Sequence, residues 1–172
     1  MPTGTTDWFA VGSDTYVDEN DDGAGFSSED HMKMKGPGTT NEKAALIQFR
    51  IGSPADLGIA TNAVVTGVDI RWTYDTHAYG NSVVTWFVLN NAFSAAVVDW
   101  ATTDGTTTWT PDRDGGGSSV EYSGQAGIES TFTQTGATKT TNLTAGFTDN
   151  HWTFGDTVSL IGYTTNEHGG GG

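Results

Sequence analysis

The chain consists of short stretches in which hydrophobic and polar residues alternate, separated by clusters of Gly, Asp, Asn and Ser. The alternation is clearest at residues 65–75, where every second position is apolar: Val68, Ile70, Trp72 and Tyr74. A period of two predicts a β-strand with one buried face and one exposed face. Residues 44–51 and 83–89 are more continuously apolar, which is typical of strands covered on both faces. We expect these two strands to form the centre of the core.

Further candidate strands lie at residues 15–18, 31–35, 95–101, 119–122, 139–144 and 157–164. About eight strands with turn residues between them, and almost no helical periodicity, predict an all-β fold, a jelly-roll β-sandwich of two antiparallel sheets. Residues 102–136, rich in Thr, Gly, Ser and Asp, should form a long loop or an irregular hairpin insertion. The glycines at 169–172 should form a flexible tail, or one held by a partner.

Composition narrows the class of protein. The 172 residues fit a single domain, residues 1–172, and six Trp, eight Phe and five Tyr supply large side chains for its core. A net charge of −14 makes nucleic acid and anionic membranes poor partners. The absence of cysteine excludes disulfides and thiolate metal sites. We expect no signal peptide, because residues 1–10 lack a basic region followed by an apolar stretch, and no apolar run approaches the ~20 residues that a membrane span needs.

Residues 18–29 match the calcium-loop pattern D-x-[DN]-x-[DN]-G-x5-E. Calcium prefers oxygen ligands, and the pattern predicts these: Asp18, Asn20, Asp22, the carbonyl of Ala24, and Glu29. Gly25 occupies the eighth position of the loop, which is usually apolar, and residues 15–17 have the pattern of a strand rather than a helix. We therefore do not expect the helix-loop-helix structure of an EF-hand. The alternative is an acidic loop in which Asn, Asp and Gly serve turn geometry.

The same region resembles a known family. The stretches that carry the resemblance are residues 14–20 (DTYVDEN), 25–28 (GFSS), Met32, Met34 and 43–49 (KAALIQF), followed by Ser53-Pro54 and a strand at 64–72. They are similar to the DNRLRE domains, which are jelly rolls like carbohydrate-binding modules, and the match covers residues 14–76. The resemblance implies a β-sandwich of the kind found in secreted polysaccharide-active proteins, archaeal surface proteins and phage virions. It leaves the function open among these.

We expect no enzyme. The four histidines are scattered without the spacing of a zinc helix, and no nucleophile is paired with a base. Asp112 with Asp114 or Glu121 could supply a pair of carboxylates, but no spacing rule marks them as a glycosidase site.

Two functions fit this sequence. The first is a non-enzymatic structural or attachment protein of a particle surface, such as a capsid decoration or tail accessory of a phage virion, which needs no signal peptide. Its exposed sheet edges would join a homo-oligomer or a capsid or tail lattice. The alternative is a calcium-dependent polysaccharide-binding module of a secreted protein. Its sugar-stacking candidates are aromatic residues in loop-like contexts: Tyr79, Trp109, Tyr122 and Trp152. Aromatic residues near strand ends are more often core, and Trp72, Trp86 and Trp100, which fall in strand patterns, should be buried.

Overall fold

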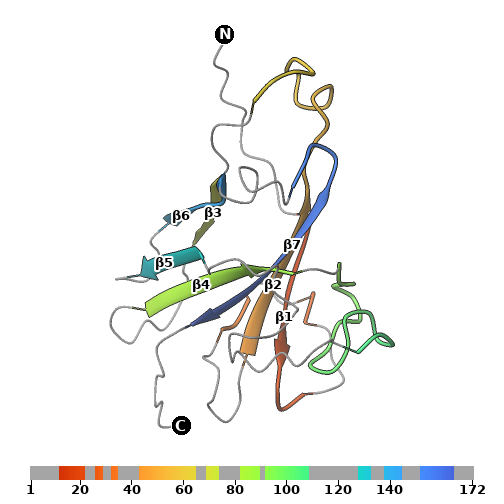
Figure 1. The fold of residues 1–172 in the computed structure, drawn as a ribbon. Coiled ribbons are helices and arrows are strands. Elements are labelled where there is room, and N and C mark those ends of the chain that lie inside the picture. Colours follow the sequence, from red (N-terminus) through yellow and green to blue (C-terminus); the bar gives the residue numbers. More distant parts are fainter. Residues whose placement is uncertain are drawn as a thin grey trace.

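The computed structural model describes residues 12–21, 26–28, 32–34, 43–64, 69–73, 82–89, 92–108, 128–132, 138–144 and 152–164. These residues contain seven strands: β1 (Ser13–Asp18), β2 (Lys43–Arg50), β3 (Asp69–Thr73), β4 (Ser82–Val88), β5 (Ile128–Phe132), β6 (Thr138–Asn142) and β7 (Thr157–Thr164). They form two antiparallel sheets, and this part of the chain has almost no helix (Figure 1). No helix within it is long and apolar enough to cross a membrane.

The larger sheet has five strands in the order β1-β2-β7-β4-β5, and the smaller sheet pairs β3 with β6. β7 lies between β2 and β4, so strands far apart in the sequence are neighbours in the sheet (Figure 1). Ile161 of β7 is opposite Leu46 on one side and Phe87 on the other. β2 and β4, the two strands that we expected at the centre of the core, therefore flank β7, whose central place the sequence analysis did not predict.

The strands β2 and β7 of the larger sheet are buried on both faces. Alternate residues of β2 point to opposite faces, so Ala45 and Ile47 join one core while Ala44 and Leu46 join another. The first core also contains residues from outside this sheet: Ile70, Leu143 and Trp152. The second core is completed by the segment 92–108, through Phe93 and Val98. This double burial explains the continuous apolar pattern of β2.

An aromatic contact joins the two sheets within the first core. Trp86 is 1% exposed, and its ring lies against Gly162 on the neighbouring strand. Trp72 of the smaller sheet meets Trp86 edge to face, with 5.5 Å between the ring centroids. The indole N–H of Trp72 donates a hydrogen bond of 3.0 Å to Oγ1 of Thr141. The small residue at position 162 thus makes room for the ring that carries the contact.

Most of the expected strands are confirmed. β1, β2, β4, β6 and β7 fall at the predicted stretches, and β3 covers the central part of residues 65–75. In β3, Ile70 is buried and Trp72 half-buried, while Asp69, Arg71 and Thr73 are exposed, so the predicted alternation holds. Trp86 is buried as expected, whereas Trp72 and Trp100 are only partly buried.

Two expected strands are wrong. Residues 32–34 and 95–101 are not in strands. At 95–101 the reason is turn chemistry, because the Asp99 carboxylate accepts hydrogen bonds from the backbone N–H groups of Ala101 and Thr102. β5 lies inside the stretch 102–136, where we expected a loop or an irregular hairpin insertion. Residues 119–122 and 169–172 lie outside the described residues.

Candidate functional site

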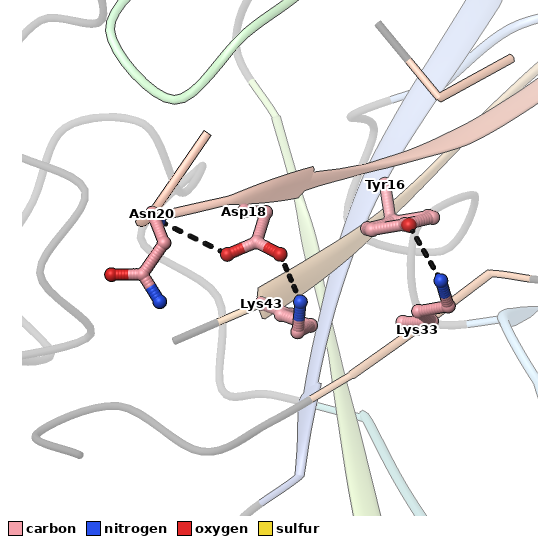
Figure 2. A network of polar contacts seen from close by, with 5 residues as sticks. All are labelled: Tyr16, Asp18, Asn20, Lys33 and Lys43. Carbon is pink, nitrogen blue, oxygen red and sulfur yellow. Dashed lines mark hydrogen bonds and ion pairs between the residues drawn. The ribbon is translucent and has the colours of Figure 1, made fainter. Parts of the chain in front are cut away.

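A cluster of charged and aromatic side chains lies at the end of β1. Because alternate residues of a strand share a face, Tyr16 and Asp18 point to the same side of the sheet. The register places Asp18 directly opposite Lys43, the first residue of β2. Lys43 Nζ forms an ion pair with Asp18 Oδ2, and the two side chains are 26% and 11% exposed, respectively (Figure 2). The sheet register itself thus brings this pair together.

The other oxygen of Asp18 closes a turn. Its Oδ1 accepts a hydrogen bond of 3.0 Å from the backbone N–H of Asn20. The backbone N–H of Asp21 donates to the carbonyl oxygen of Asp18 at 3.1 Å. Such side-chain capping is typical of Asp in turns. Asp18 therefore has a structural role in the turn at residues 18–21.

The Asp18 carboxyl is held in its charged form. Burial alone would raise its pKa, but hydrogen bonds from Lys43 and from the Asn20 N–H outweigh burial. The positive charges of Lys43 and Lys33 act in the same direction as the hydrogen bonds. The pKa of Asp18 therefore lies below its ordinary value of 3.8, and the pair is ionic at neutral pH.

Tyr16 forms the aromatic part of the cluster. It is 1% exposed, and the ring of Phe26 stacks on it with 4.2 Å between centroids and an angle of 10°. Lys33 Nζ donates a hydrogen bond of 2.9 Å to the Tyr16 hydroxyl (Figure 2). Lys33 Nζ and Lys43 Nζ lie 5.0 and 5.9 Å from the centre of the ring, within the range of cation–π attraction. Two of the seven basic residues of the chain thus converge on one ring.

We name these residues the Tyr16 cluster: Tyr16, Asp18, Asn20, Phe26, Lys33 and Lys43. The sequence pattern pointed to Asp18 and Asn20 but not to Lys33 or Lys43 as their neighbours. The contact between Asp18 and Lys43 depends on the strand register, which the spacing of residues does not specify. The family resemblance includes Lys43 as the first residue of the stretch 43–49, and this was the available signal for Lys43.

The calcium prediction stays a prediction. Asp18 and Asn20 are described, whereas Asp22, Ala24 and Glu29 lie outside the described residues. Within the described part of the chain, no group of three His, Asp or Glu residues is placed to hold a metal ion.

Of the four sugar-stacking candidates, only Trp152 is among the described residues. Tyr79, Trp109 and Tyr122 lie outside the described residues, as do Asp112, Asp114 and Glu121. Trp152 is 5% exposed and packs in the first core. Its ring is therefore covered by the protein in this structure.

Several other acidic residues close turns. Asp56 Oδ2 accepts hydrogen bonds from the N–H and hydroxyl of Ser53, and Asp156 Oδ2 does the same for Thr153. Asp104 accepts four hydrogen bonds from the backbone and hydroxyls of Thr106 and Thr107. Part of the acidity of the chain therefore serves turn geometry rather than a binding site.

Comparison with known proteins leaves the family open. No protein-family model matches the sequence, and no curated protein matches it. The resemblance to DNRLRE domains stays a prediction that rests on the motifs in residues 14–76.

Proposed function

We propose that this chain is a non-enzymatic structural or attachment protein of a particle surface, such as a capsid decoration or tail accessory protein of a virion. The observation that carries the proposal is the open five-stranded sheet. Among the described strands, its edge strand β1 pairs only with β2, and its edge strand β5 pairs only with β4. An open strand edge offers a row of backbone donors and acceptors with which a second subunit can pair.

On the edge strand β1, Ser13 and Asp14 are the accessible positions for such a joint, because its last four residues, Thr15 to Asp18, are buried. The Tyr16 cluster fixes one face of the strand. A strand whose side chains are already ordered loses little conformational freedom when a neighbour pairs with it. The net charge of −14 of the chain favours a basic partner surface.

The finer fold that we propose is a jelly roll of the DNRLRE kind. In support, all strand pairs are antiparallel, and β7 inserts between β2 and β4. Ile70 of the smaller sheet and Leu143, which directly follows β6, lie in the core that covers one face of the larger sheet. Such sandwiches serve both as binding modules and as building blocks, so the fold alone does not select the function.

The alternative function is a calcium-dependent polysaccharide-binding module. The outer face of the smaller sheet favours it, because six exposed polar side chains lie there: Asp69, Arg71, Thr73, Thr138, Thr140 and Asn142. Asn142 donates a hydrogen bond of 2.9 Å to Asp69, and the Thr73 and Thr138 hydroxyls lie 3.3 Å apart. Pre-ordered polar groups of this kind can bind the hydroxyls of a sugar polymer. Gel retardation by polysaccharides, compared between the wild-type chain and Arg71→Ala, would test this alternative.

The assembly state tests the main proposal. Light scattering on a sizing column, with and without calcium, should show a discrete oligomer or a growing assembly. Asp14→Lys places a lysine on the edge strand β1 at an exposed position, which should weaken association, because charged side chains block edge pairing. Asp69→Lys makes the same charge change on β3 and is the matched control. A wild-type chain that stays monomeric at all concentrations would contradict the proposal and favour the polysaccharide-binding module.

A further inference from the structure

We propose that the Lys43 ammonium group is the resident cation of the turn at residues 18–21, and that it takes the place of a calcium ion at Asp18. Asp18 is the first ligand that the calcium pattern requires, and the structure pairs its Oδ2 with Lys43. A divalent ion at Asp18 would compete with this ammonium group for the carboxylate. The inference concerns the cation chemistry of β1 and does not depend on assembly into a particle.

The contacts of the carboxylate support this role. Oδ1 accepts a hydrogen bond from the backbone N–H of Asn20, and Oδ2 accepts one from Lys43 Nζ, so both oxygens have partners (Figure 2). Asp18 as a whole residue, backbone included, is 8% exposed. A calcium ion beside the paired ammonium would bring like charges together in a partly buried place, where their repulsion is poorly screened.

The position of Lys43 in the sheet explains why its ammonium group can replace a bound ion. It is the direct cross-strand partner of Asp18, so pairing of β1 with β2 delivers the ammonium group to the carboxylate. An ion from solution stabilises the folded chain only in proportion to its occupancy, which depends on its concentration. A tethered cation is present in every folded molecule. The same ammonium group lies 5.9 Å from the Tyr16 ring, so it also ties the turn to the aromatic cluster.

A double-mutant cycle on the full chain tests the proposal. Melting midpoints are measured for the wild-type chain, Lys43→Met, Asp18→Asn and the double variant, each with calcium and with chelator at one ionic strength. We expect Lys43→Met to lower the midpoint, and Asp18→Asn to cost less in the Lys43→Met chain than in the wild type, because the pair is already broken. Lys33→Met is the matched control, since Lys33 contacts Tyr16 rather than Asp18, and it should couple less strongly to Asp18→Asn.

The calcium measurements decide the second half of the proposal. Any response of the wild-type midpoint to calcium should be the same in Asp18→Asn, because Asp18 is not available to the ion. Should a variant fail to fold, Lys43→Arg keeps the positive charge and should keep most of the wild-type midpoint. A calcium-induced rise that disappears in Asp18→Asn would overturn the proposal, and so would strictly additive costs in the cycle.

Intact mass spectrometry supplies an independent check. The proposal requires the mass of the unmodified sequence, because Lys43 must keep its charge. A mass lower by one water molecule, with the loss mapped to a peptide that joins Asp18 to Lys43, would mean that an amide had formed between them, and the proposal would be wrong. Neither result depends on the assembly state, so failure of the particle-surface proposal and failure of this inference are distinguishable.

Discussion

At the scale of single residues, Gly162 has the least room for a side chain among the described glycines. A Cβ atom added there would lie 2.6 Å from the nearest carbon of the Trp86 ring. We predict that Gly162→Ala destabilises the chain by about 1–3 kcal/mol, the usual cost of overpacking a core. Guanidinium unfolding measures this cost. In Gly162→Ala with Trp86→Phe the smaller ring should relieve the clash, so the pair should cost less than the sum of the single changes. A Gly162→Ala chain with an unchanged free energy of unfolding would contradict this close contact with Trp86.

Asp104 gives a prediction about pH. Hydrogen bonds from the backbone N–H groups of Thr107 and Thr106, and then from their hydroxyls, lower the pKa of Asp104 to about 2. Because the folded pKa lies below the ordinary value of 3.8, the carboxylate stabilises this turn above the unfolded pKa, and the effect is lost as pH falls through the folded pKa. Carboxyl NMR titration should give a midpoint near the lowered value. In Asp104→Asn, the amide signals of Thr106 and Thr107 should lose their response to pH in this range. A midpoint at the ordinary value would contradict the hydrogen bonds.

At the scale of secondary-structure elements, the contact of Trp72 with Thr141 stabilises the pair β3–β6. Thr141 is 2% exposed, and its Oγ1 accepts the indole N–H of Trp72. Thr141→Val removes this acceptor and leaves the N–H in a partly buried place, which should cost about 1–3 kcal/mol. Thr140→Val, at an exposed position of the same strand, should change stability by about 0.5 kcal/mol or less. If Thr141→Val and Thr140→Val lowered the free energy of unfolding in urea by equal amounts, the hydrogen bond would contribute nothing to stability.

The same scale shows which elements the sequence could predict. Strands with a period of two or a continuous apolar run were predictable, because burial on one face or on both produces those patterns. Residues 95–101 misled this reasoning. Val98 is fully buried while Val97 is 47% exposed, so the segment has an inner and an outer side like a strand. Its backbone is nevertheless turned, since the N–H groups of Val97 and Val98 both donate to the carbonyl of Ser94.

The sheet order and the contacts of the candidate site could not be predicted from the sequence, for a different reason. β2 and β7 are neighbours although more than a hundred positions separate Ile47 from its partner Leu160, and no local pattern encodes such a pairing. The acidic motif at residues 18–29 predicted turn chemistry at Asp18 as one of two alternatives, and the Asn20 contact agrees with it. The partner of that carboxylate, Lys43, became visible only with the register of β1 and β2.

At the scale of the whole molecule, the two cores share the same strands. β2 and β7 each contribute to both, because Ile47 and Leu160 face the first core while Leu46 and Ile161 face the second. Neither core can lose its packing without disturbing strands that the other needs. We therefore expect the described sheet and its two coverings to unfold in one cooperative transition.

One substitution in each core tests this expectation. Leu143→Ala in the first core should cost about 2–5 kcal/mol, and Phe93→Ala in the second about 3–5 kcal/mol. Both should lower the midpoint of the same guanidinium transition and leave its slope unchanged, because the slope follows the surface exposed on unfolding. Trp86 lies in the first core and Trp100 packs against the second. The fluorescence that is lost in Trp86→Phe therefore reports the first core, and the fluorescence that is lost in Trp100→Phe reports the second. Two separate transitions, or a substitution that shifts only the signal from its own side, would mean that the segment 92–108 unfolds independently of the sheet that it covers.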